Sequence, residues 1–376
     1  MRQSLVCLVL AAVLAGSASG KPRRAKNVIL LLADAGGIPT LNAASIVGYN
    51  APLKLFVQSW PHVGLSDTSP VGSWVSDSAA GMTAIVTGQK THNGVISMGP
   101  DTVRGKKDGT RLKTILEYAE ERGLSTGVIS NVTIADATPA ACYSQANDRR
   151  KLDEIFLQIF SPRFGDGVDF VLGPGRKRIY GVAAANGRDI DAAAARAGRP
   201  VLKSLAELPA EARRGLVVAD EGFDLEAAVK RALGSLSKNR KGFFLMIESD
   251  AHTDNPEAGL GRLIAFDKLI REISTLVNRD ETLLVFTADH SFDLRVPAGK
   301  PEEPLLKGFD EWKRTKGKGP VHLPYIKVDG SHTAEEVVVA ATGPGAERVR
   351  GFLPNTEIFR IMMEAYGWRP EARQAK

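Results

Sequence analysis

Apolar runs that end on acidic residues are the main feature of this 376-residue chain. The runs at 28–33, 243–247 and 283–288 are followed directly by Asp34, by Glu248 and by the pair Asp289 and His290. Runs of this kind are typical of strands buried on both faces of a parallel sheet. Because such sheets bind ligands at the carboxyl ends of their strands, acidic residues and a histidine gathered there predict a site for several metal ions.

Helix-like segments alternate with the strand-like runs from residue 27 onward, which indicates βαβ units within one domain over 21–376. Pattern and capping residues predict a helix over 110–123, a strand over 124–130 and helices over 149–160 and 355–366. The last of these helices is expected to dock on the sheet.

Two segments have no sustained periodicity. The first, 161–240, is interpreted as an elaboration of the same domain that contains strands at 168–172 and 216–219. The second, 292–331, is rich in Pro, Lys and Gly and is interpreted as a small surface insertion between two core elements.

The first twenty residues have the layout of a secretory signal peptide. Arg2 precedes an apolar run, and a stretch of small residues at 16–20 then leads to a predicted cleavage site between Ser19 and Lys21. The run is shorter than the roughly 20 residues of a membrane-spanning helix. We therefore expect a periplasmic or secreted protein with no transmembrane anchor after cleavage; an uncleaved anchor is the alternative.

Cysteine usage and charge narrow the function classes. Cys7 lies in the signal, so Cys142 alone remains; it cannot form an internal disulfide, and we interpret it as a small core residue rather than a nucleophile. The net charge of +6 could draw anionic substrates to a cleft, although a solvated basic surface explains it equally well. No nucleic-acid-binding motif is present, so a specific nucleic acid partner is not expected.

Three motifs carry candidate chemistry. Ser78 lies where the loop 74–77 enters a helix, and the amides and dipole at a helix start favour a phosphate group and a serine alkoxide. The alternative is that Ser76, Asp77 or Ser78 only caps the helix. The oxygen ligands Asp136 and Thr138 suit Mg²⁺.

The third motif, 248–254, contains four potential ligands directly after a strand. Glu248, Asp250, His252 and Asp254 combine carboxylates with a histidine and no cysteine, which suits Zn²⁺. His332 follows Gly330 and Ser331 and is placed directly before a helical run.

Taken in order, these motifs resemble those of the alkaline phosphatase family, and the resemblance spans residues 27 to about 345. It implies an α/β three-layer sandwich with a central, mostly parallel sheet flanked by helices. It also implies hydrolysis of phosphate monoesters through a phosphoserine at two zinc ions and one magnesium ion. Small phosphate monoesters and inorganic phosphate would be the partners, and the enzyme could form a homodimer.

The resemblance also implies roles for single residues, with Ser78 as nucleophile and Arg149 as the bidentate phosphate ligand. One zinc would be held by Asp34, Asp289 and His290, and the other by His252, His332 and an aspartate. Mg²⁺ would be held by Asp136, Thr138 and Glu248, with Asp34 bridging.

The turn that carries the second zinc site departs from the family pattern. Glu248 and His252 are about five residues closer than in the family, so either Asp250 or Asp254 could complete that site. Two alternatives to the monoesterase remain: a phosphodiesterase or phosphonate hydrolase of the same superfamily, and a catalytically weak phosphate-binding relative.

Overall fold

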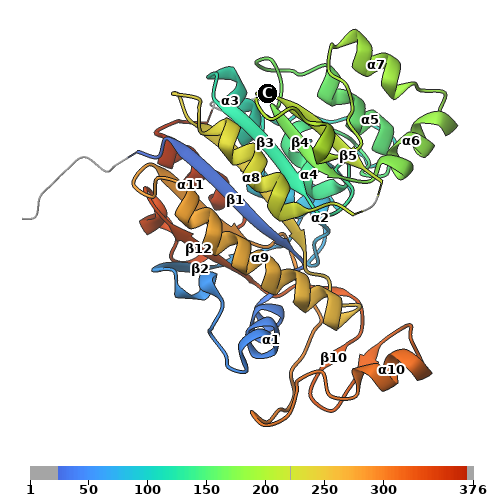
Figure 1. Cartoon of the computed structure of the whole chain (residues 1–376), viewed down its shortest axis with the longest axis vertical. Coiled ribbons are helices and arrows are strands. Elements are labelled where there is room, and N and C mark those ends of the chain that lie inside the picture. Colours follow the sequence, from blue (N-terminus) through green and yellow to red (C-terminus); the bar gives the residue numbers. More distant parts are fainter. Residues whose placement is uncertain (1–23, 221, 371–376) are drawn as a thin grey trace, which may run out of the picture.

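A nine-stranded mixed sheet forms the centre of the computed structural model, which describes residues 24–220 and 222–370 (Figure 1). The strand order is β13-β2-β12-β7-β1-β6-β3-β4-β5, and β12 alone runs against the other strands. The strands of this sheet are β1 (Asn27–Asp34), β2 (His62–Asp67), β3 (Ser125–Ser130), β4 (Phe170–Pro174), β5 (Gly215–Ala219), β6 (Phe243–Asp250), β7 (Thr282–Thr287), β12 (Val337–Thr342) and β13 (Gly351–Pro354).

Helices cover both faces of the sheet and make it the middle of three layers, as predicted. Each face of the sheet has its own hydrophobic core, and successive residues of β1 point into opposite cores. Leu30 packs in the core on the side of α2, α3, α4, α5, α6 and α11, whereas Leu31 packs in the core on the side of α1, α8 and α9. The helices are α1 (Ile38–Tyr49), α2 (Ser78–Thr87), α3 (Ile115–Glu121), α4 (Ala137–Tyr143), α5 (Leu152–Leu157), α6 (Arg176–Ala185), α7 (Ile190–Arg196), α8 (Leu225–Leu236), α9 (Pro256–Leu276), α10 (Phe309–Thr315) and α11 (Thr356–Tyr366).

Strand register brings the predicted acidic residues to one edge. In the parallel pairs of the central strands, Asp34 lies beside Asp250, and Glu248 lies beside both Leu32 and Ser130. The strand β7 pairs with β1 on the other side, so the residues that follow Thr287 reach the same edge. The neighbouring parallel strands β7, β1, β6 and β3 therefore have their carboxyl ends side by side at one edge of the sheet.

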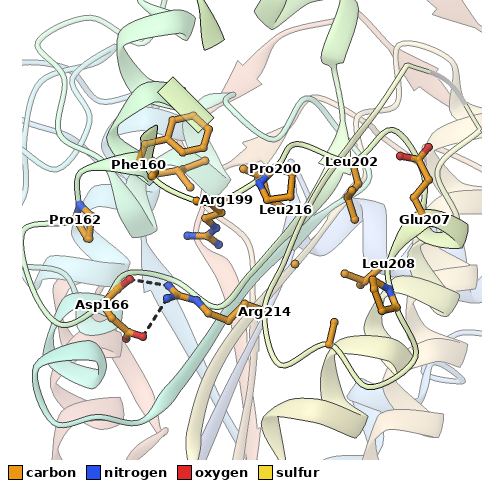
Figure 2. Close-up of a pocket in the computed structure, with 16 residues that line it drawn as sticks. Phe160, Pro162, Asp166, Arg199, Pro200, Leu202, Glu207, Leu208, Arg214 and Leu216 are labelled. Atoms are coloured by element: carbon orange, nitrogen blue, oxygen red, sulfur yellow. Dashed lines mark hydrogen bonds and ion pairs between the residues drawn. The ribbon is translucent and has the colours of Figure 1, made fainter. Parts of the chain in front are cut away.

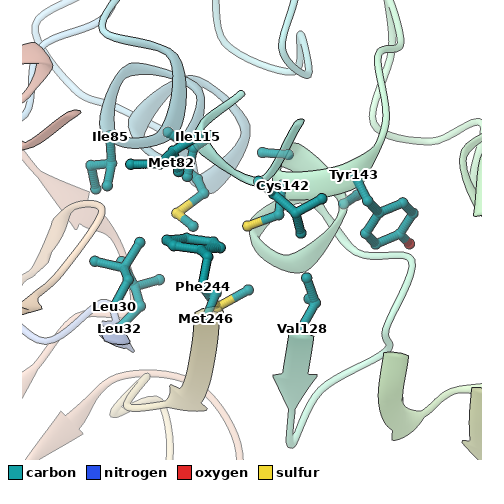
Figure 3. Close-up of a cluster of buried hydrophobic side chains, with 14 of the residues drawn as sticks. Leu30, Leu32, Met82, Ile85, Ile115, Val128, Cys142, Tyr143, Phe244 and Met246 are labelled. Atoms are coloured by element: carbon teal, nitrogen blue, oxygen red, sulfur yellow. The ribbon is translucent and has the colours of Figure 1, made fainter. Parts of the chain in front are cut away.

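The core between the sheet and the helices on the α2 side contains the single cysteine of the described chain. Cys142 is fully buried among Met82, Val128 and Phe244, and burial raises the pKa of its thiol well above the usual range (Figure 3). It is a core residue, as the sequence indicated, since a buried and protonated thiol is inert.

Helix boundaries differ from the prediction at two places. The helix expected from residue 110 begins at Ile115, because Thr114 caps it in a reciprocal capping box with Glu117, while Arg111 forms an isolated bridge with Met98. The helix expected over 149–160 is shorter, with α5 over Leu152–Leu157 and a 3₁₀ turn over Gln158–Phe160.

The segment 161–240 contributes both strands predicted within it, as β4 and β5, to the main sheet. The final helix α11 packs on β1 and α2, as expected. The prediction that His332 precedes a helix is wrong. His332 and Thr333 form β11 (His332–Thr333), which pairs antiparallel with β8 (Ser291–Phe292), and the chain then enters the strand β12.

The pairing of β8 with β11 closes the base of the segment 292–331. Beyond this base the segment carries α10, β9 (Val321–His322) and β10 (Lys327–Val328), which lie past the N-terminal end of α9 (Figure 1). Its two ends are flanked by His290 and His332, so the short ladder fixes the position of one histidine relative to the other.

The predicted signal peptide lies outside the described residues. Within 24–220 and 222–370, none of the helices is long and apolar enough to cross a bilayer.

Candidate metal centre

Asp34, Asp289 and His290 form the first candidate metal group, with one ligand atom from each within 4.8 Å of the others. Nε2 of His290 lies 3.3 Å from Asp34 Oδ1 and 3.5 Å from Asp289 Oδ2. The other oxygen of Asp289 accepts hydrogen bonds from the backbone amides of Ala35 and His290. These bonds fix the Asp289 carboxylate, so that Oδ2 is left to face the group.

Ser78 is the first residue of α2, and its hydroxyl faces the same group. Asp77 caps the helix through the amide of Ala80, and Ser78 Oγ lies 3.3 Å from His290 Nε2. Nδ1 of His290 must donate to the carbonyl oxygen of Ser291, 3.2 Å away, because a carbonyl only accepts. Burial lowers the pKa of His290 to about 4, so Nε2 presents a lone pair, as a metal ligand requires.

His252, His290 and His332 form the second candidate metal group, in which Nε2 of His252 and Nε2 of His332 are 3.3 Å apart. Nδ1 of His332 donates to the carbonyl oxygen of Ser76, and Nδ1 of His252 lies 2.8 Å from Asp250 Oδ1. Because both Nδ1 atoms carry the proton, the lone pairs of the two Nε2 atoms face each other unless a proton or a cation lies between them. Two nitrogens that share a tetrahedral zinc at about 2.0–2.1 Å are about 3.3 Å apart, so the spacing fits this metal.

Asp250 contacts His252 on the side away from His332. It accepts from Nδ1 of His252, and its second oxygen forms an ion pair of 2.6 Å with Arg262 of α9. Asp254, the alternative to Asp250, is exposed, and within the described residues it forms no hydrogen bond or ion pair with His252 or His332. The turn after β6 thus brings Asp250, and not Asp254, to His252.

Four of the predicted metal ligands each have a buried oxygen without a hydrogen-bond partner. These oxygens are Asp34 Oδ1, Thr138 Oγ1, Glu248 Oε1 and Asp289 Oδ2. Burial and the Asp289 charge raise the pKa of Asp34 well above its usual range, and burial and the Asp34 charge do the same for Glu248. Carboxylates buried together without partners are costly, and hard oxygen ligands of this kind suit Mg²⁺.

Arg149 lies beside this group between two aspartates. Its Nη2 donates to Asp136 Oδ1 at 2.8 Å and its Nη1 to Asp77 Oδ2 at 3.2 Å. Burial alone would lower the pKa of the guanidinium, but the two carboxylates raise it further above its usual range. The fork therefore stays charged, and it lies next to the helix start that carries Ser78.

Several residues that complete the centre were not singled out by sequence reasoning. Ser130 donates to Glu248 Oε2 at 2.5 Å, Arg262 holds Asp250, and Arg178 lies 3.8 Å from Asp136. Arg178 belongs to the basic cluster 176–178, which the sequence shows only as surface charge. Its position after β4 was the one available sign that it reaches this edge of the sheet.

The fold and this cluster together define an α/β protein with a candidate cation-binding centre at the carboxyl edge of its sheet. The family model described as "Alkaline phosphatase" matches residues 25–212 and 219–304. The chain belongs to the alkaline phosphatase family.

Characterised relatives extend over nearly the whole chain. Streptomycin-6-phosphate phosphatase of Streptomyces griseus is 30% identical, over 93% of this chain and 92% of the relative. Alkaline phosphatase of Escherichia coli (strain K12) is 28% identical, over 95% of this chain and 88% of the relative. Phosphate esters are therefore the substrate class that the family implies.

Solved structures agree with the fold. Alkaline phosphatase of the Antarctic bacterium TAB5 is 25% identical with a TM-score of 0.72, over 93% of this chain and 100% of that one. A variant of that enzyme carries Mg in a site termed M3. Thermus thermophilus alkaline phosphatase has a TM-score of 0.76 at 24% identity, over 96% of each chain, which supports the fold alone.

Proposed function

We propose that this enzyme hydrolyses phosphate monoesters through a phosphoserine formed on Ser78. The observation that carries the proposal is the 3.3 Å approach of Ser78 Oγ to Nε2 of His290, beside the partnerless oxygens of Asp34 and Asp289. A serine hydroxyl is a poor nucleophile at its free pKa, and a metal ligand set next to it provides the activation that it needs.

The donor set supports two zinc ions and one magnesium ion. Asp34, Asp289 and His290 would hold one zinc, and His252 and His332 the other, with Asp250 orienting His252 through Nδ1. Thr138, Glu248 and Asp34 would hold Mg²⁺, with Asp136 beside them. When bound, these cations lower the pKa of the attacking oxygens and neutralise charge on the phosphoryl group and the leaving oxygen.

Ser78 Oγ attacks phosphorus, and the bond from phosphorus to the ester oxygen breaks, so that the alcohol leaves after taking up a proton. Water then attacks the phosphoserine, and inorganic phosphate and the free serine are released. Arg149 binds the two non-bridging oxygens that face it and holds phosphorus in line with Ser78 throughout. Its bonds to Asp77 and Asp136 keep the guanidinium plane in place for this contact.

A monoester is favoured over a diester because its phosphoryl group has three unsubstituted oxygens, two for Arg149 and a third for the cations, whereas a diester has only two. The test compares hydrolysis of p-nitrophenyl phosphate with that of bis-p-nitrophenyl phosphate by the wild type and Ser78→Ala. We expect a strong preference for the monoester and loss of turnover in the variant. A higher kcat/KM for the diester would assign the enzyme to the phosphodiesterase alternative. Phosphate binding without turnover would assign it to the binding-protein alternative.

The natural ester is proposed only as a class, a small phosphate monoester. The likeness to a streptomycin-6-phosphate phosphatase makes aminoglycoside phosphates a useful part of a substrate panel. We also propose that the protein is exported and acts in the periplasm or outside the cell.

A further inference from the structure

A cavity of about 530 Å³ lies far from the metal centre, at the other edge of the sheet. It opens where β4 and β5 begin, near Gly215 and Leu216, whereas the metal centre lies where the strands end. Its wall is mostly apolar and includes Phe160, Pro200, Leu202, Leu208 and Leu216 (Figure 2). A concave, mainly apolar space of this size suits a small organic molecule.

Two arginines of the wall, Arg199 and Arg214, have a buried Nε that forms no hydrogen bond, but that of Arg214 lies 3.4 Å from the Asp169 carboxylate. Arg199 reaches in among the lining side chains between Phe160 and Arg214 (Figure 2). Its Nη2 donates to the carbonyl oxygens of Val168 and Asp169, but its Nε is buried and has no hydrogen-bond partner. An unpaired buried donor of a charged group is costly, so the guanidinium lacks acceptors within the described chain. Its Nη1 forms no hydrogen bond there either and, unlike Nε, is not enclosed, so it is the donor that an acceptor from outside the chain can reach.

The charge of Arg199 is compensated only from a distance, by the carboxylates of Asp169, Glu120 and Asp166. Within the part of the chain that the structure describes, no carboxylate forms an ion pair with it, whereas the neighbouring Arg214 pairs with Asp166 and Asp169. Burial and the charge of Arg214 lower the pKa of Arg199 to about 10, which still leaves it protonated at neutral pH. A buried cation beside an apolar cavity favours an anionic ligand.

The carboxylates around the cavity limit the charge that such a ligand can carry. Asp166 and Glu207 line it as well, and they would repel a phosphate dianion more strongly than a monoanion. We propose that this cavity is a binding site for an organic monocarboxylate, with its carboxylate on Arg199 and an apolar body against Phe160, Leu202 and Leu208. The site is independent of the Ser78 chemistry.

The competing explanation is that Arg199 only ties the loop around residue 199 to the start of β4 through the two carbonyls. The probe that separates the two is 4-phenylbutyrate, titrated calorimetrically into the full holoenzyme with the metal centre saturated by inorganic phosphate. We expect saturable binding of one molecule per chain. The uncharged amide, 4-phenylbutyramide, should bind at least about tenfold more weakly, since it lacks the charge-assisted bond.

Variants locate the site. Arg199→Gln should weaken 4-phenylbutyrate binding at least about tenfold, and Arg199→Lys should weaken it less, because the charge is kept. Arg213→Gln removes an exposed arginine next to Arg214 and should leave the affinity unchanged within about twofold.

Four results would overturn the proposal. These are equal binding of the carboxylate and its amide, displacement of the probe by inorganic phosphate, unchanged affinity in Arg199→Gln, and the absence of saturable binding. If Arg199→Gln does not fold, the comparison of acid and amide on the wild type decides.

Discussion

Nε2 of His252 lies 3.3 Å from Nε2 of His332, although the Nδ1 atoms of both rings already have hydrogen-bond acceptors. The carboxyl end of β6 supplies the first histidine and the β8–β11 ladder supplies the second. Their approach is stable only with a proton or a cation between the two nitrogens. In the holoenzyme we assign the position between the two nitrogens to a metal ion. The metal would then stabilise the fold as well as take part in catalysis.

Metal removal should therefore make stability depend on pH. In the metal-free protein the pKa values of Asp34 and Glu248 are raised by burial. That of His252 is raised to about 9, because its carboxylate partners outweigh burial. Groups with raised folded pKa values stabilise the fold below their unfolded values and lose that contribution as pH rises through the folded values. His290, with its pKa lowered to about 4, is neutral in both the folded and the unfolded state above about pH 7.5, so it adds little pH dependence to the stability between pH 7 and pH 9.

The Tm of the metal-free protein should consequently fall by several degrees between about pH 7 and pH 9, and that of the holoenzyme should change much less. Differential scanning calorimetry of chelator-treated and metal-loaded protein checks this. Parallel curves for the two forms would contradict the assignment of these residues to a metal centre. Groups outside the centre, such as Glu120, contribute equally to both curves.

Replacement of Arg149 by Ala should weaken phosphate binding. The two bonds of the fork are worth about 1.5–3 kcal/mol each, so we expect the inhibition constant of inorganic phosphate to rise at least about 100-fold, with a parallel rise in KM. Arg149→Lys keeps the charge but loses the bidentate geometry, and should be intermediate. An unchanged inhibition constant in Arg149→Ala would show that the guanidinium does not bind substrate.

The short turn after β6 should make Asp250 more important than Asp254. Asp250→Asn removes the carboxylate that orients His252, and loss of such partners lowers metal affinity about 10- to 100-fold. Asp254→Asn is the matched control, because Asp254 is exposed and, unlike Asp250, forms no hydrogen bond with His252 in the described chain. Zinc affinities from competition with a chelating dye decide between the two; a larger loss in Asp254→Asn would reverse the roles.

Gly81 should be needed for the position of Ser78. A Cβ at Gly81 would lie 2.4 Å from the carbonyl oxygen of Asp289, so an alanine there would push α2 away from the metal group. Gly81→Ala is expected to cost about 1–3 kcal/mol of unfolding free energy and to lower kcat/KM at least about tenfold.

Gly261→Ala on α9 is the control for this change, because a Cβ there meets nothing within 4 Å. It should be neutral or stabilising by up to about 1 kcal/mol. Urea unfolding and steady-state kinetics of both variants check the pair. Equal stability and activity in the two would show that α2 is not held at this distance.

The strand-end residues of the centre could be predicted from the sequence. Asp34, Glu248, Asp289 and His290 follow apolar runs, and parallel strands bring such positions together whatever the details of packing. Ser78 was predictable for a similar reason, since a helix start after a polar loop has a local signature.

Long-range pairing and side-chain orientation could not be predicted in the same way. His332 was expected before a helix, but its strand exists because β11 pairs with β8, some forty residues earlier in the chain. The contact of Asp250 with Arg262 depends on how α9 packs across the end of β6. Arg178 reaches Asp136 from another helix, and no local pattern encodes that approach.

The central claim is that Ser78 carries the phosphoryl group during turnover. The most direct measurement is acid quenching of the holoenzyme during hydrolysis of phenyl phosphate, followed by peptide mass spectrometry. The account predicts a phosphate adduct on the peptide that contains Ser78, and its absence in Ser78→Ala together with loss of turnover. Turnover without this adduct in the wild type, or turnover at the wild-type rate in Ser78→Ala, would contradict it.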